Sequence, residues 1–133
     1  MSFGSKSAAL TYSREREAFG QPISEFQAIQ LKLADMATKI QAARLLIYWA
    51  AAGADKGERV DMQAGMAKLF ASEVAVEAAL DAMRIHGGYG YSQEFVVERL
   101  YRDAPLMTIG EGTSDVMRLV IAKALISGKE TVG

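Results

Sequence analysis

SEFQAIQLKLADMATKIQAARLLIYWA, residues 24–50, is the stretch that decides the fold class. Its apolar side chains recur at alternating steps of three and four, which places them on one face of an α-helix. They are Phe26, Ile29, Leu33, Met36, Ile40, Ala43, Ile47 and Ala50. Ser24 and Gln27 have the spacing of a capping box, and Gly53 and Gly57 end the segment. The sequence therefore predicts a long helix that packs against another helix.

A second long helix is expected after a short polar link. It should begin at Asp61, a favourable N-cap residue, and end at Gly87-Gly88. Its packing face, here called its seam, again consists of residues at alternating steps of three and four: Met66, Leu69, Glu73, Val76, Leu80 and Met83. Matched lengths and a short link predict an antiparallel hairpin of helices. Glu73 would lie on this apolar seam, where an unpaired charge is costly, and Arg44 is one candidate partner.

The rest of the chain is interpreted as shorter helices. The first is expected from about Ser7 to Phe19, ended by the glycine and proline of Gly20-Gln21-Pro22. Another is expected over residues 94–103 and a last one over residues 114–127. No segment alternates as a strand would. The predicted fold class is therefore all-α, an up-and-down bundle of the four-helix type.

Composition narrows the class of protein. The chain has 133 residues, enough for one domain with one core. Its formal net charge of -1 gives no electrostatic basis for binding nucleic acid or an anionic membrane, and no apolar run is long enough to span a membrane. With no cysteine and one histidine, neither a disulfide framework nor a metal site is expected. The absence of cysteine is consistent with a reducing compartment; the expected location is the cytoplasm, with the mitochondrial matrix as the alternative.

The N-terminal residues differ in character from the rest of the chain. Residues 1–7, MSFGSKS, are small and polar and lack the apolar core of a signal peptide. We interpret them as a leader or truncated start, and residues 8–133 as one helical domain.

Glu111 is the candidate reacting group. It lies between Gly110 and Gly112, directly after the mostly apolar residues 105–109. A carboxylate among apolar neighbours loses water, which raises its pKa and makes it a stronger base. The two glycines allow another molecule to approach the backbone closely. The alternative interpretation is a solvated residue ahead of a helix.

The start signals of the last helix come directly after Glu111. Thr113 and Ser114 are the candidate N-cap residues, and Asp115 places a negative charge in the first turn, where the helix dipole favours it. Gly128 is expected to end the helix.

A glycine-rich segment, residues 86–90 (HGGYG), comes after the second long helix. It is not a dinucleotide fingerprint, because that motif follows a strand. It is either a helix C-cap with a tight turn or a set of exposed N–H groups that meet a phosphate or an adenine edge. His86 is interpreted as a hydrogen-bonded helix terminus. Residues 14–17 (RERE) are either a solvated helix face or supply one arginine to a pyrophosphate.

Taken in order, these motifs resemble the C-terminal helical domain of acyl-CoA dehydrogenases, flavoproteins that desaturate acyl thioesters. The matching segments are 12–20 (YSREREAFG), 26–30 (FQAIQ), 33–36 (LADM), 67–70 (AKLF), 85–91 (IHGGYGY), 101–103 (YRD) and 109–114 (IGEGTS). They cover nearly everything from about Ala8 to Ile126.

The resemblance implies a role for each matched site residue. Glu111 would be the base that removes the α-proton of an acyl-CoA substrate while a β-hydride passes to the flavin of FAD, and Gly112 would lie beside the substrate. The implied FAD-binding residues are Arg16, Gln27, Arg84, Ile85, His86, Gly87, Gly88, Thr113, Ser114 and Asp115. Arg16, Gln27 and residues 84–88 would reach the flavin across a subunit interface. An electron-transfer flavoprotein would be the electron acceptor.

Two positions and the chain length depart from the family pattern. Arg84 stands where many members have glutamine, and Gly110 where some have tyrosine. Full members also carry an N-terminal helical domain and a middle β-domain, and neither is expected within these 133 residues. We therefore expect this chain by itself to bind FAD weakly or not at all and to associate into a dimer or tetramer through uncovered apolar surface. The alternatives are a non-catalytic oligomerising bundle and a domain of an acyl-CoA oxidase or related flavoprotein.

Overall fold

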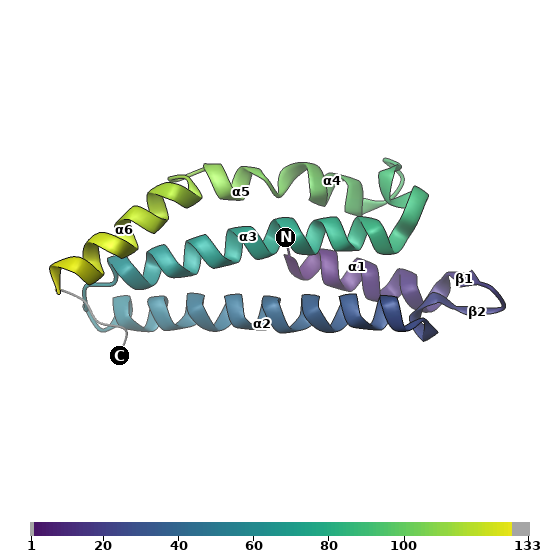
Figure 1. Cartoon of the computed structure of the whole chain (residues 1–133), viewed down its shortest axis with the longest axis horizontal. Helices are drawn as coiled ribbons and strands as arrows, with labels where there is room; N and C mark the ends of the chain where they lie inside the picture. Colours follow the sequence, from purple (N-terminus) through teal and green to yellow (C-terminus); the bar gives the residue numbers. More distant parts are fainter. Residues whose placement is uncertain (1, 129–133) are drawn as a thin grey trace.

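The chain folds as an elongated all-α bundle, seen in a computed structural model that describes residues 2–128 (Figure 1). Its elements are α1 (Ser2–Glu15), β1 (Glu17–Ala18), β2 (Gln21–Pro22), the 3-10 helix η1 (Ile23–Glu25), α2 (Gln27–Asp55), α3 (Asp61–His86), the 3-10 helix η2 (Gly87–Tyr91), α4 (Val96–Asp103), α5 (Leu106–Ile109) and α6 (Ser114–Ser127). α2 and α3 run side by side, and the α4–α6 segment returns along α3 (Figure 1). The predicted all-α, up-and-down bundle is confirmed.

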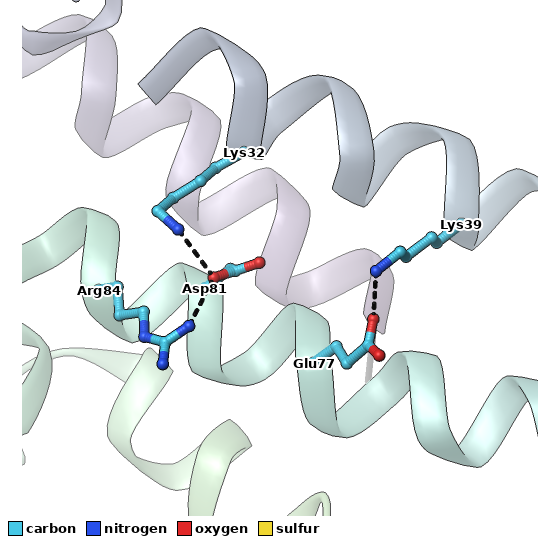
Figure 2. Close-up of polar contacts among 5 residues, drawn as sticks. All are labelled: Lys32, Lys39, Glu77, Asp81 and Arg84. Atoms are coloured by element: carbon cyan, nitrogen blue, oxygen red, sulfur yellow. Dashed lines mark hydrogen bonds and ion pairs between the residues drawn. The ribbon is translucent and has the colours of Figure 1, made fainter. Parts of the chain in front are cut away.

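α2 and α3 form the predicted antiparallel hairpin. Lys32 Nζ lies 3.3 Å from Asp81 Oδ1, and Lys39 Nζ lies 2.5 Å from Glu77 Oε2, so positions that rise along α2 meet positions that fall along α3 (Figure 2). Arg84 Nη1 also contacts Asp81 Oδ1, at 3.3 Å. Ion pairs that are exposed or only partly buried add little stability, so the hairpin depends chiefly on the apolar side chains packed between the helices.

The two helices bury different kinds of residue. On α2 the predicted seam is confirmed at Met36, Ile40, Ala43 and Ala50, all buried, whereas Ile47 is 47% exposed. On α3 the predicted seam is wrong, because its members are only half-buried. The buried positions are mostly small and lie on several sides of the helix: Gly65, Ala67, Ser72, Ala75, Ala78, Ala79 and Ala82. α3 contacts α1, α2, α4 and α6, and small side chains let that many helices approach it.

The segment before α2 departs most from the sequence-based expectation. α1 begins at Ser2 and ends at Glu15, and β1 and β2 then pair as an antiparallel hairpin. The expected first helix is therefore confirmed, but its expected bounds of about Ser7 to Phe19 are wrong, and so is the expected absence of strands. Phe19 and Gly20 have φ of 53° and 83°, the pair of positive values that a tight hairpin turn needs. Residues 2–7, interpreted from the sequence as a leader or truncated start, form the first turns of α1.

The predicted capping box does not form. η1 occupies residues 23–25, and α2 is capped by Phe26 without a side-chain hydrogen bond. Gln30 Nε2 donates instead to the backbone oxygen of Ser24, at 3.0 Å. At its other end α2 continues through Gly53 to Asp55, and Gly57 makes the turn with φ of 76°. The predicted start of α2 is thus misplaced by two residues, whereas its end lies between the two glycines that were expected to end it.

Candidate functional site

Glu111 lies at a sharp turn between α5 and α6. Its φ is 56° and that of Gly112 is 101°, so two successive residues have left-handed backbone. This conformation is uncommon for a residue with a side chain and is kept only where the surrounding structure holds it. The predicted cap follows directly, because Thr113 Oγ1 accepts from the Val116 N–H at 3.2 Å. Gly128, with φ of 63°, ends α6 as predicted.

A cavity of about 520 Å³ opens beside this turn. It is lined by Lys68, Ala71, Ser72, Ala75, Leu106, Met107, Gly110 and Glu111. α3 supplies a wall of small side chains, and α5 supplies Leu106 and Met107. The cavity thus combines a carboxylate with a largely apolar wall, a composition that suits binding of an apolar chain next to a proton acceptor.

The expected desolvation of Glu111 is wrong for the described chain, because Glu111 is exposed. The apolar residues upstream do not cover it: Leu106 and Ile109 are each 61% exposed and Met107 is 41% exposed. These side chains form one wall of an open cavity, and nothing within residues 2–128 closes the opposite side. A dry site at Glu111 needs cover from outside this part of the chain.

Two side chains join the turn and the start of α6 to α3. Lys68 Nζ donates to the backbone oxygen of Gly112. Arg118 on α6 lies 2.5 Å from Glu73 Oε1 and 3.3 Å from Asp115 Oδ1. Arg118 is therefore the partner of Glu73, and the suggested Arg44 is wrong.

Arg44 is occupied elsewhere. Its guanidinium carbon lies 4.1 Å from the centroid of the Phe3 ring on α1, a distance at which a cation is attracted to an aromatic face. This contact joins α2 to the beginning of α1.

A second cavity, of about 490 Å³, lies where α1, η1, η2 and the end of α3 meet. It is lined by Tyr12, Arg16, Ile23, Ile85, His86, Gly87, Gly88 and Tyr89. His86 is buried, and its Nδ1–H donates to the backbone oxygen of Ala82 at 2.8 Å. Burial lowers the pKa of His86 below its usual 6.5, and the hydrogen bond to Ala82 opposes that effect only partly. The interpretation of His86 as a hydrogen-bonded helix terminus is confirmed.

The second cavity presents cationic, aromatic and open backbone surface together. Tyr12 stacks on His86 with ring centroids 4.1 Å apart. The Arg16 guanidinium lies 5.4 Å from the Tyr89 ring centroid, and no carboxylate among the described residues pairs with it. A side-chain carbon at Gly87 or Gly88 would meet nothing within 4 Å. This surface can accept an anionic and aromatic ligand, which fits part of a dinucleotide such as FAD.

The remaining predicted cofactor residues are not gathered in one place. Arg84 is exposed and bound to Asp81; neither it nor the exposed Gln27 lines either of these two cavities. Ser114 has a buried Oγ without a hydrogen-bond partner at the start of α6. Such an unsatisfied hydroxyl is the kind of group that a ligand satisfies.

The two cavities contact different parts of α3: the first contacts residues 68–75, and the second contacts the end of the helix at Ile85 and His86. Ile85 lies 10 to 17 positions beyond the α3 residues Ala75 and Lys68 that line the first cavity, about 15–25 Å at the α-helical rise. The structure therefore brings the predicted site residues together as two separate groups. One group surrounds Glu111, and the other surrounds Arg16 and Gly87-Gly88.

Sequence reasoning missed the role of several residues that line the cavities. Lys68, Tyr12 and Tyr89 lay within the recognised motifs, but no contact was assigned to them. A lysine in an otherwise apolar helical stretch, Met66 to Phe70, is the one signal that could have singled out Lys68.

Within residues 2–128, no group of three or more His, Asp or Glu side chains is arranged to hold a metal ion. In the same part of the chain, no helix has the length and apolar character needed to cross a bilayer.

Comparison with known proteins identifies the family. A family model described as the acyl-CoA dehydrogenase C-terminal domain matches residues 5–126. The chain is 56% identical over 119 residues to the probable acyl-CoA dehydrogenase YngJ of Bacillus subtilis, covering 90% of this chain and 31% of that protein. It is 48% identical over 123 residues to the caffeyl-CoA reductase-Etf complex subunit CarC of Acetobacterium woodii, covering 92% and 32%.

A solved structure agrees with these relatives. The structure of butyryl-CoA dehydrogenase from Megasphaera elsdenii superimposes with a TM-score of 0.93 at 42% identity, covering 94% of this chain and 33% of that one. The chain thus spans about a third of the length of the relatives it matches. It belongs to the acyl-CoA dehydrogenase family, in which it corresponds to the C-terminal helical domain.

Proposed function

We propose that this chain supplies the catalytic base and part of the cofactor site of an FAD-dependent acyl-CoA dehydrogenase. The reaction is α,β-desaturation of an acyl-CoA thioester. Glu111 removes the α-proton, and FAD, when bound, supplies the ring that accepts the β-hydride. The observation that carries this proposal is the cavity that joins the Glu111 turn to a wall of small and apolar side chains.

The chain's own residues account for the positioning of the base. The left-handed backbone at Glu111 and Gly112 turns the chain sharply at the cavity, which Gly110 and Glu111 line. The Glu111 N–H would donate to the thioester oxygen, where negative charge develops as the α-proton leaves. Because Glu111 is exposed in this chain, the acyl group and the rest of the enzyme must exclude water during the reaction.

The cofactor residues are proposed to act from two subunits. Arg16, Gln27 and residues 84–88 would contact FAD from one subunit, and Thr113, Ser114 and Asp115 from its neighbour. The separation of about 15–25 Å along α3 supports this division, since one chain does not bring the two groups to one cavity.

The oligomer that this requires is a dimer or tetramer. Apolar side chains exposed along α2 support it, and they include Leu31, Leu45, Tyr48 and Trp49, which are 61%, 58%, 61% and 39% exposed. Apolar surface of this extent is typical of an interface between proteins. Light scattering that gives a monomer at high concentration would contradict the proposal.

An electron-transfer flavoprotein is the proposed redox partner. The name of the Acetobacterium woodii relative, which places it in a reductase-Etf complex, supports this partner. The same name raises a second candidate function, reduction of an enoyl-CoA. In that direction Glu111 would return the α-proton as the acid, since the forward and reverse reactions share one transition state.

Replacement of the base tests the proposal. In an acyl-CoA dehydrogenase that carries this domain, Glu111→Gln keeps the shape of the side chain and removes the proton acceptor. Bleaching of the flavin by acyl-CoA should slow by at least about a hundredfold, the contribution of general-base catalysis. Glu94→Gln, at another exposed glutamate, is the matched control and should react normally. A Glu111→Gln enzyme that bleaches as fast as the parent would reject the role and favour a non-catalytic bundle.

A further inference from the structure

The Glu111 turn has a conformation that local contacts do not explain fully. Two successive positive φ values are unfavourable where the first residue carries a side chain. A side-chain carbon at Gly112 would lie 2.7 Å from Met117 Cε, so the turn is also tightly packed against the first turn of α6. Such a conformation is kept when neighbouring groups restrain it.

The hydrogen bonds around the turn are of two kinds. Most are local: the Gly110 N–H donates to Leu106 O at 2.8 Å, and the Met117 N–H donates to Thr113 O at 3.0 Å. One crosses from another helix, where Lys68 Nζ on α3 donates to Gly112 O. The local bonds fix the ends of α5 and α6, whereas the Lys68 bond holds the peptide that directly follows Gly112.

The position of Lys68 favours this bond over competing contacts. Lys68 is half-buried and lines the same cavity as Glu111. Among the described residues it forms no ion pair with a carboxylate. An ammonium that donates to a carbonyl in a partly buried setting forms a charge-assisted hydrogen bond, which is stronger than a neutral one.

We propose that Lys68 is a positioning residue for the base: its bond to Gly112 O holds the turn in the conformation that aims Glu111 into the cavity. The inference rests on the proposed function of Glu111. Lys68 itself does not touch the reacting atoms. It acts through the backbone, and because both groups belong to this chain, the bond forms without cofactor or substrate.

Three variants test the inference in the flavin-loaded enzyme that carries this domain. Lys68→Met keeps the length and apolar stem but removes the donor, and Lys68→Arg keeps a charged donor. Lys123→Met is the matched control, because Lys123 is an exposed lysine on α6. The measurements are the rate of flavin reduction by acyl-CoA, the substrate dissociation constant, and hydrogen exchange of the Val116 and Met117 amides without substrate.

The expected result is specific to a positioning role. Lys68→Met should slow flavin reduction by about tenfold to a hundredfold, the size of effect that a small misplacement of a catalytic group produces, with the substrate dissociation constant within about threefold of the parent. Exchange at Val116 and Met117 should speed up while exchange in α2 stays unchanged. Lys68→Arg should restore most of the rate, and Lys123→Met should match the parent.

Other outcomes overturn the inference. Parental exchange at Val116 and Met117 in Lys68→Met would do so, as would exchange that rises equally throughout α2. If Lys68→Met does not fold, Lys68→Gln replaces it under the same criteria. Failure of the proposed function is recognised separately, because Glu111→Gln would then bleach normally while the exchange data still report on Lys68.

Discussion

Gly90 gives a sharp test of how η2 sits against α3. Gly90 is buried, and a side-chain carbon there would collide with Met83 O and lie 3.0 Å from Met83 C and Cα. These are backbone atoms of α3, so no side-chain rotation can relieve the contact, and η2 must move away from the helix. Gly88, two positions earlier, has nothing within 4 Å of such a carbon. The same glycine-to-alanine substitution can therefore be compared at a crowded position, Gly90, and at an open one, Gly88.

Gly90→Ala should destabilise the chain by about 1–3 kcal/mol, the usual cost of overpacking. At roughly 4 °C for each kcal/mol in a domain of this size, the melting temperature should fall by roughly 4–12 °C. Gly88→Ala should leave stability unchanged or raise it by up to about 1 kcal/mol, because alanine restricts the unfolded chain. Urea unfolding followed by far-UV circular dichroism measures both variants. Equal effects of the two substitutions would refute the close packing of η2 on α3.

Three further predictions concern packing, pH and capping. Val97 is fully buried, so Val97→Ala should cost roughly 1–3 kcal/mol through lost burial and a residual cavity, measured by urea unfolding; a loss near zero would contradict its place in the core. The lowered pKa of His86 means that the folded chain favours the neutral ring, so this contribution to stability is complete above the usual pKa of 6.5 and is lost as the pH falls through the lower, folded-state pKa. The unfolding free energy should therefore drop less on acidification in His86→Gln than in the parent, and parallel pH curves would contradict this. Thr113→Ala removes the hydroxyl that caps α6 and should cost about 1 kcal/mol, with faster hydrogen exchange at Val116; an unchanged Val116 amide would contradict the cap.

The sequence predicted well the elements whose signals are local. The buried face of α2 could be predicted because its large apolar residues form one stripe that packs against a neighbouring helix. Met36 and Ile40 are buried as expected. The start of α6 at the Thr113 cap and its end at Gly128 could be predicted because a single residue type favours each helix end.

Features that depend on residues far apart in the sequence could not be predicted from it. α3 has helices on several sides, so its buried positions are spread around it as alanines and no single stripe of large residues marks them. The hairpin at 17–22 was taken for a helix end, because glycine and proline mark both structures. Predicting Arg118 as the partner of Glu73 would have required knowledge of how α6 packs on α3.

The sequence identified residues of the candidate site but not their arrangement in space. Glu111 was expected in a dry environment because apolar residues precede it in sequence, yet Leu106 and Ile109 are largely exposed. Adjacent residues in a one-turn helix such as α5 project in different directions, so neighbours in sequence need not cover a side chain.

The length of α3 has a consequence for assembly. The helix lines the cavity beside Glu111 through Lys68 and the second cavity through Ile85, the two parts of the proposed site (each called a half-site here). If neighbouring subunits each complete the other's cofactor site, the number of residues in α3 sets the distance between adjacent catalytic centres. Inserting a single residue between Lys68 and Ile85 would shift one half-site by about 1.5 Å and turn it by about 100° around the helix axis, so point substitutions should be tolerated in this stretch far better than changes in its length.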